Sequence, residues 1–537
     1  MLLLSLIFLL LANAVTKRRE KSILFNRVAI IILLYSSIVG YDSLAITSLG
    51  RGISIYGGLF HSTAITHSFD IFINLVSGII IGLTAFNPRY LKTAKPLNLK
   101  LGHSNIDKDK LIKKGEGYSI IEYPLLLLFI VLGATFLMSS SDLVSMFLSI
   151  ELQSYGLYIF ATLYRNSELA TSAGLSYFLL GGLSSCLILL GSTLLYINSG
   201  LTNLDGIYIL ASFFENKEIE SLFTDVESFN KGQYFNISLI ILSVGYLFKV
   251  AAAPFHFWSP EVYDAVPTVV TTTLTTIPKL SIFVLLLELV HNLGKSIPLD
   301  NNMWVYILLI SSFLSLIIGT VAGLVQYRLK RLLAFSAISH VGFLLLALSV
   351  NSVESDQALI FYLVQYSLSN VNIFFIIIAI GHLLFETITQ DKNVIERNNS
   401  PVQYIYQLKG LYHLNPIISI SLAISIFSLA GIPPLVGFFG KQLILSAALE
   451  KGYYFLSLVG ILTSVIGAVY YLGIVKLMFF ESAEDKTVQA EENRVFYLST
   501  SMSIVISVIT LMILLFMTYL STSLRSANIL ALILSST

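Results

Sequence analysis

The stretch 245–267, GYLFKVAAAPFHFWSPEVYDAVP, places a lysine within a long apolar run and a proline five residues after it. A charged side chain such as that of Lys249 costs about 2.5 to 3.5 kcal/mol at the centre of a membrane, so a partner or water is expected beside it. Pro254 has no amide hydrogen, and its ring clashes with the carbonyl four residues earlier. The stretch therefore predicts a membrane-spanning helix that breaks directly after a buried cation.

A second stretch, 430–445, repeats this combination as AGIPPLVGFFGKQLIL. Pro433 and Pro434 remove two successive amide donors, and Lys441 follows two helical turns later. Pairs of broken helices in corresponding positions are typical of internally repeated transporters, whose ion sites lie at the breaks. We therefore expect two related halves, although the lysine precedes the break in one half and follows it in the other.

The composition is that of a membrane protein. Of 537 residues, 55% are apolar and 12% are charged, against roughly 25% charged in soluble domains. A net charge of +1 without a dense basic face excludes nucleic acid as a partner. Cys186 is alone, so an internal disulfide or an iron–sulfur cluster on this chain is excluded. Because nucleotide-binding loops and metal-ligand spacings are also missing, we expect no cofactor and no metal here.

Apolar runs between polar segments predict an all-α polytopic membrane protein with about fourteen transmembrane helices. The predicted spans are 1–15, 23–45, 68–86, 119–138, 142–163, 169–197, 235–258, 267–293, 303–325, 332–350, 357–385, 413–449, 453–480 and 496–520. The apolar stretch 527–534 is too short to cross. Spans four to eight and nine to thirteen form two five-helix repeats, and the odd number makes them inverted. The predicted domains are 1–118, 119–293, 303–480 and 481–537.

The distribution of basic residues supports this count. Connections after odd-numbered spans hold 21 lysines and arginines, whereas the even-numbered connections and the C-terminal tail hold 6. Eight of the 21 lie in a linker between Arg89 and Lys114. Under the positive-inside rule the odd connections face the inner side, and both termini face the outer side.

Several ionisable residues fall inside the predicted spans. Lys279 follows Pro278 in a hydroxyl-rich segment, and Glu151 lies deep in the fifth span. Because an opposite charge favours the ionised forms of both groups, a Glu151–Lys249 pair would hold a proton that is released when the pair opens. Lys476 is close to the end of its span, where it is expected to reach the membrane surface.

Two histidines are candidate proton-relay groups. His256 follows the first helix break directly, and His340 lies in the tenth span. An imidazole has an unperturbed pKa near 6.5 and exchanges protons readily at physiological pH. For His340, a purely structural role in helix packing is an equally good interpretation.

Four segments together resemble the antiporter-like family of proton-translocating membrane subunits, as found in respiratory complex I. They are FLSIELQSYGLY (147–158), FKVAAAPFHFWSPEVYDAVPT (248–268), LKRLLAFSAISHVGF (329–343) and LAGIPPLVGFFGK (429–441). In this family a glutamate on the fifth span pairs with a lysine on the seventh, a lysine on the eighth bridges the halves, and an ionisable residue on the twelfth ends the row. The resemblance assigns these positions to Glu151, Lys249, Lys279 and Lys441.

The resemblance also implies a function and a setting. It implies a subunit of the proton-translocating NADH:ubiquinone reductase, a multi-pass protein of the mitochondrial inner membrane. No redox chemistry would occur on this chain, since FMN and iron–sulfur clusters would belong to partner subunits. The expected partners are other membrane and peripheral subunits of complex I and membrane lipid, including bound phospholipid.

Two other interpretations remain open from the sequence alone. A subunit of a multisubunit Na⁺/H⁺ antiporter shares these helices and has no redox partner. A structural membrane scaffold would use the same charges only to fix helix packing.

Overall fold

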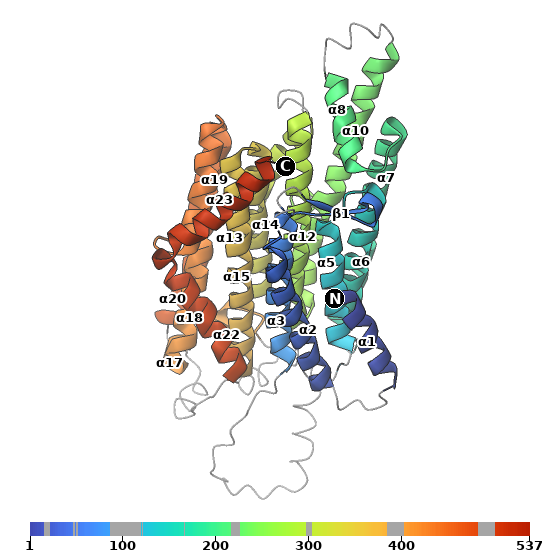
Figure 1. The fold of residues 1–537 in the computed structure, drawn as a ribbon. Helices are drawn as coiled ribbons and strands as arrows, with labels where there is room; N and C mark the ends of the chain where they lie inside the picture. The colour runs from blue at the N-terminus through green and yellow to red at the C-terminus, as the bar shows by residue number, and fades with distance from the viewer. Residues whose placement is uncertain are drawn as a thin grey trace, which may run out of the picture.

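The computed structural model describes residues 1–15, 22–46, 49, 52–85, 120, 122–165, 167–215, 226–296, 303–383, 402–481 and 500–536. The basic linker between Arg89 and Lys114, and many of the basic connections that set the predicted orientation, lie outside these residues. Figure 1 shows long helices side by side in one elongated bundle.

The helices follow one another along the chain in four groups. The N-terminal group contains α1 (Leu2–Val15), α2 (Ser22–Ser43) and α3 (Ala64–Ala85). The first half of the bundle contains α5 (Glu122–Met138), α6 (Leu143–Ala161), α7 (Glu168–Ser199), α8 (Leu204–Glu215), α10 (Val226–Val250), α11 (Trp258–Ala265) and α12 (Thr268–Ser296). The second half contains α13 (Met303–Leu324), α14 (Leu329–Val350), α15 (Val353–Leu383), α17 (Leu411–Leu414), α18 (Pro416–Ala430), α19 (Val436–Glu450) and α20 (Tyr454–Phe479). The C-terminal group contains α22 (Thr500–Leu514) and α23 (Leu520–Ser536).

The predicted fold class is confirmed. Within the described residues, nine helices are long and apolar enough to cross a membrane, and shorter apolar helices occupy the remaining predicted spans. The helix α12 lies between the two halves and contacts α5, α6, α14 and α15. In the most apolar segment of α12, 94% of the residues are buried inside the protein. A charge on α12 is therefore surrounded by protein rather than by lipid.

Both predicted helix breaks are present. The helix α10 ends at Val250 and α11 begins at Trp258, while α18 ends at Ala430 and α19 begins at Val436. The backbone turns at Ala251 with φ +63° and at Gly431 with φ +85°. These are left-handed conformations, which end a helix.

The two breaks share a hydrogen-bond pattern. In the first, the amide of Ala252 donates to the carbonyl of Leu247 at 3.0 Å. In the second, the amide of Ile432 donates to the carbonyl of Phe427 at 3.1 Å. Each residue of the second pair lies 180 positions after its counterpart in the first. The breaks are therefore equivalent turns in two related halves.

A close helix contact also recurs in both halves. Between α5 and α6, a Cβ atom on Gly133 would lie 2.7 Å from the backbone nitrogen of Gln153. One turn away in this contact, a Cβ on Gly156 would lie 2.9 Å from Ile130. Small residues allow such close approach of helix backbones in membranes.

Between α13 and α14 the same arrangement is found 186 positions later. A Cβ on Gly319 would lie 2.6 Å from the backbone nitrogen of Ser339, and one on Gly342 would lie 2.9 Å from Leu316. The recurrence of all four positions supports the predicted internal repeat. The domain boundaries themselves stay a prediction.

Three features differ from the sequence prediction. An unexpected helix, α8, follows α7, and a short antiparallel pair of strands, β1 (Ile53–Ile55) and β2 (Phe60–Ser62), precedes α3. The predicted span 496–520 is wrong at its C-terminal end, because α22 stops at Leu514 and α23 forms a separate helix of 17 residues. Near this break the hydroxyls of Thr518 and Thr522 donate to the carbonyls of Leu515 and Tyr519.

Replacing Gly319 by alanine should destabilise the α13–α14 contact, because the added methyl group meets backbone rather than a movable side chain. We expect a cost of about 1–3 kcal/mol and a lower melting temperature in detergent. Gly182→Ala is the matched control, since nothing lies within 4 Å of the added Cβ. Equal melting temperatures for the two variants would contradict the close contact.

Candidate functional site

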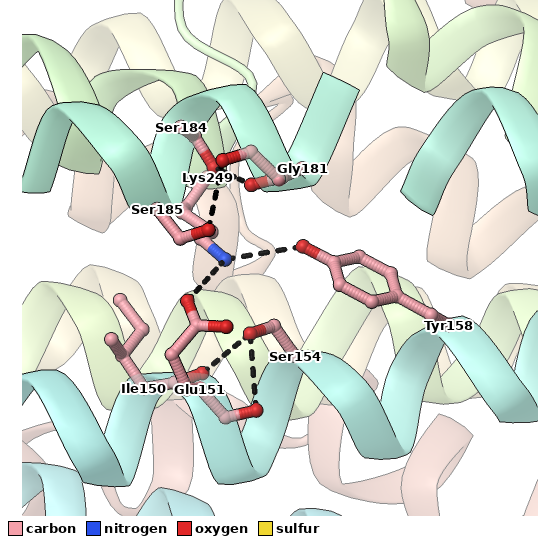
Figure 2. A network of polar contacts seen from close by, with 9 residues as sticks. Ile150, Glu151, Ser154, Tyr158, Gly181, Ser184, Ser185 and Lys249 are labelled. Carbon is pink, nitrogen blue, oxygen red and sulfur yellow. Dashed lines mark hydrogen bonds and ion pairs between the residues drawn. The ribbon is translucent and has the colours of Figure 1, made fainter. Parts of the chain in front are cut away.

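The first charged centre lies between α6, α7 and α10. Lys249 Nζ is 3.7 Å from Glu151 Oε1 and donates a hydrogen bond to the hydroxyl of Tyr158 at 3.2 Å. The Lys249 side chain is 8% exposed. Figure 2 shows the ammonium of Lys249 between α6 and α7, with Ser185 of α7 on the side away from Glu151. The predicted pairing of Glu151 with Lys249 is thus present in the structure.

The break after Lys249 is held by an aromatic residue. Trp258, the first residue of α11, donates its indole N–H to the carbonyl of Phe248 at 2.9 Å. Its ring stacks on Tyr177 of α7 with a centroid distance of 4.8 Å. The last carbonyls of a helix have no partners within the helix. Trp258 therefore satisfies one of them and fixes the end of α10 against α7, beside the charged centre.

Lys279 lies on the central helix α12 and is 4% exposed. Its Nζ donates to the hydroxyl of Tyr366 on α15 at 3.3 Å. The ammonium also faces the ring of Tyr263 at 5.9 Å and the ring of Tyr366 at 5.7 Å. Rings at such distances attract a cation. Among the described residues, no carboxylate lies within ion-pair distance of Lys279, so its proton is held by neutral groups.

Lys441 reaches back across the second break. Although it lies in α19, its Nζ donates to the carbonyls of Leu429 at 3.0 Å and Ala430 at 2.9 Å, in the last turn of α18. The C-terminal end of a helix carries a partial negative charge and favours a cation. Leu429 is the residue equivalent to Lys249, 180 positions later. Lys249 is thus part of the last turn of α10, whereas Lys441 reaches the equivalent turn of α18 from the following helix.

His340 lies between Lys279 and Lys441. Its Nδ1 is 2.6 Å from the hydroxyl of Tyr362, and its Nε2 is 3.2 Å from that of Tyr471. The ring is 5.3 Å from the ring of Tyr366, which receives the hydrogen bond of Lys279. On the other side, the ring of Phe343 lies 6.3 Å from that of Tyr362 and 5.5 Å from the ammonium of Lys441. His340 is therefore placed to connect the two lysines.

The charged groups form a row across the bundle. In Figure 1, α6 and α10 lie on one side, α12 lies in the middle, and α14, α15 and α19 lie on the other side. The row therefore runs across the helix axes, and hence along the plane of a membrane that the helices span.

Tyrosines join the row, and the sequence analysis missed them. The ring centroid of Tyr158 lies 4.8 Å from that of Tyr177, which stacks on Trp258. The ring centroid of Trp258 lies 6.2 Å from that of Tyr263, and the ring of Tyr263 faces Lys279. Tyr158 lies seven residues after Glu151, which places both on one helix face. That spacing was the signal available in the sequence. The contacts across helices were not visible there.

His256 is placed differently from the other candidates. It is buried at the first break, where its ring packs against Phe257 at 4.6 Å and Phe335 at 6.5 Å. Its position gives no direct link to the lysine row. Lys476 is 71% exposed and lies 3.9 Å from Glu481 at the end of α20, as expected for a lysine at the membrane surface.

The segment after the first break is tied to the second half. Asp264 of α11 forms a 2.5 Å ion pair with Arg328, which precedes α14. This hydrogen bond raises the pKa of Arg328, so the arginine stays charged. Lys330, one of the basic residues that follow the ninth predicted span, is 2% exposed and donates to the carbonyl of Val266 at 2.7 Å. These contacts couple the position of α11 to that of α14.

Residues 140–467 match the family model described as NADH:quinone oxidoreductase/Mrp antiporter, transmembrane. This segment is more than half of the chain and contains all six candidate residues. The chain belongs to this family. Its charged row lies within the family's common region, whereas α1, α2, α3 and the C-terminal helices lie outside it.

Relatives and solved structures extend this result. The chain is 47% identical to NADH-ubiquinone oxidoreductase chain 2 of Rhizopus oryzae, over 99% of both chains. It is 38% identical to chain 2 of Marchantia polymorpha over 69% of each chain. It resembles a chain of respiratory complex I from Thermus thermophilus, with a TM-score of 0.66, 25% identity, and 95% and 96% of the two chains covered.

More distant relatives share the fold alone. A chain of the Mrp complex from Dietzia superposes with a TM-score of 0.72 at 17% identity, covering 98% of this chain and 95% of that one.

Replacing Gly431 by alanine should displace the ammonium of Lys441. The added Cβ would lie 3.0 Å from Lys441 Cδ and 3.3 Å from its Nζ, and the residue has φ +85°. Gly452→Ala is the control, because its φ is +86° and its nearest neighbour is 4.0 Å away. Both variants bear the backbone strain of about 1 kcal/mol. We expect only Gly431→Ala to reduce proton translocation severalfold in reconstituted vesicles; equal effects would show that strain alone is responsible.

Proposed function

We propose that this chain is a proton-translocating membrane subunit of NADH:ubiquinone oxidoreductase, in which Glu151, Lys249, Lys279 and Lys441 carry the proton movement. Identity of 47% over 99% of a chain 2 relative is the observation on which the assignment to this enzyme rests. The row of buried lysines is what supports the assignment of these residues.

The proposal makes electron transfer the task of partner subunits. FMN and iron–sulfur clusters belong to those partners, as do the binding of NADH and the reduction of ubiquinone. This chain takes part in the reaction through its charged side chains, in contact with other membrane subunits and with lipid. In the proposed orientation in the mitochondrial inner membrane, both termini face the intermembrane space.

Opening of the Glu151–Lys249 pair is the first step that the geometry supports. With Glu151 at 3.7 Å, protonated Lys249 has a counter-charge. When Glu151 moves away, the protonated ammonium is left in a largely apolar setting, and the neutral form becomes favoured. Breaking a buried pair costs about 3–5 kcal/mol. Moving one charge against 100 mV costs about 2.3 kcal/mol, so the two energies are of the same order.

The remaining groups continue the row toward the second half. Lys279 is held by hydroxyl and ring groups, and His340 contacts the hydroxyls of Tyr362 and Tyr471. A hydroxyl both donates and accepts a hydrogen bond, so it can hand on a proton without becoming charged. Lys441 ends the row at the carbonyls of α18. His256 lacks such contacts and is not part of the proposed route.

The Na⁺/H⁺ antiporter interpretation is supported by the fold alone, at 17% identity. Native mass spectrometry of the complex purified through this chain separates the two. We expect masses that include flavin- and iron–sulfur-containing subunits. A complex consisting only of antiporter subunits would contradict the proposal.

Lys249→Met tests the role of the lysine row, because methionine keeps an unbranched side chain of nearly the same length and removes its charge. We expect the assembled complex to lose most of its proton translocation, measured with a pH-sensitive dye in proteoliposomes during NADH oxidation. Lys476→Met is the control, since that lysine is 71% exposed at the end of α20. Unchanged translocation in a fully assembled Lys249→Met complex would favour the scaffold interpretation instead.

A further inference from the structure

The central helix α12 carries two further ionisable residues, Glu288 and His291, near its C-terminal end. They are three residues apart and so lie on neighbouring positions of the helix surface. His291 is 8% exposed, and its Nδ1 lies 3.4 Å from Oδ2 of Asp356 on α15, which is 3% exposed. Glu288 accepts a hydrogen bond from the hydroxyl of Thr63, just before α3, at 3.3 Å. We name these four residues the α12 end cluster.

The α12 end cluster lies toward one end of the bundle. His291 is twelve residues beyond Lys279, or about 18 Å along the helix axis. Asp356 is in the first turn of α15, and Thr63 directly precedes α3, so three helices meet there near their ends. The connection between α14 and α15 follows an even-numbered span. In the proposed orientation this end faces the outer side.

The contacts of His291 and Asp356 do not fit a purely structural pair. Neither ring nitrogen of His291, nor Oδ2 of Asp356, has a hydrogen-bond partner with good geometry among the described residues. Buried polar groups without such bonds destabilise a fold by about 1–3 kcal/mol each. The favourable interaction of an acidic group with the first turn of α15 is already available from Glu354, which is exposed. Stability alone therefore gives no reason for Asp356 and His291 to be buried together.

The charge balance points to an exchangeable proton. With all groups ionised, two carboxylates face one imidazolium, and the cluster carries a net negative charge. One added proton removes that charge. Neighbouring elements contribute further titratable groups, which are His67 and Asp70 of α3, Asp205 and Tyr208 of α8, Glu354 of α15 and the exposed Arg525 of α23. Among the described residues, no group of three or more His, Cys, Asp or Glu side chains is arranged to hold a metal ion.

From these observations we infer that His291 and Asp356, with Glu288, form a proton-exchange site between the lysine row and the outer aqueous phase. The inference rests on the proposed function. On α12, the segment from Ile282 to Leu287 separates Lys279 from the α12 end cluster, and its side chains are apolar. As a result, a proton at one place is not in free exchange with the other. Such a barrier is required if a pump is not to leak.

Asp356→Asn and His291→Gln test the site in the intact complex reconstituted into vesicles. We expect each variant to lower the number of protons moved per NADH oxidised as far as Lys249→Met does, while Asp356→Glu retains the normal ratio. Glu354→Gln is the matched control, two residues earlier on the same helix and exposed. It should leave the ratio unchanged.

The outcomes separate this inference from the proposed function. A normal ratio in both Asp356→Asn and His291→Gln, with Lys249→Met impaired, overturns the α12 end cluster alone. Normal pumping in Lys249→Met overturns the proposed function itself. Should Asp356→Asn fail to assemble, the His291→Gln variant decides, because glutamine retains a polar group of similar reach without the titratable ring.

Discussion

The cost of placing a charge inside an apolar helix bundle is the constraint on which this structure depends. Each lysine of the row meets that cost with a different partner. Lys249 has a carboxylate, Lys279 has hydroxyl and ring groups, and Lys441 has the carbonyls of a helix end. These partners differ in how strongly they favour the charged form. The row is thus a series of sites that are not equivalent for a proton.

The broken helices follow from the same constraint. A continuous helix bonds its own carbonyls and offers none to a cation, whereas a broken helix exposes its last turn in the middle of the bundle. In the first half the lysine itself is part of that last turn. In the second half Leu429 occupies the equivalent position, and Lys441 supplies the ammonium from the following helix. A lysine therefore accompanies the break in both halves, but only Lys441 bonds the carbonyls of the helix end.

Sequence reasoning found the features that depend on local chemistry. A proline inside an apolar run favours a helix break, so the breaks at Pro254 and Pro434 could be predicted, although Pro278 lies within the continuous helix α12. Apolar run lengths located the spans. The contact of Lys441 with α18 could not be predicted, because it depends on how the turn at Gly431 folds back. Lys279 and Tyr366 are 87 residues apart in the sequence and lie on different helices, so no local pattern specifies their contact.

In the proposed function, the balance of charges along the row makes proton occupancy the quantity that changes during turnover. Of the three lysines in the row, only Lys249 has a carboxylate at ion-pair distance within the described residues, so full protonation of the row would leave Lys279 and Lys441 without a counter-charge. At about 2.5–3.5 kcal/mol for each such charge, full protonation is disfavoured by several kcal/mol. Complete deprotonation would in turn leave Glu151 buried without its cation. Partly protonated states of the row avoid both of these penalties. In the proposed function, movement of Glu151 shifts protons among these states.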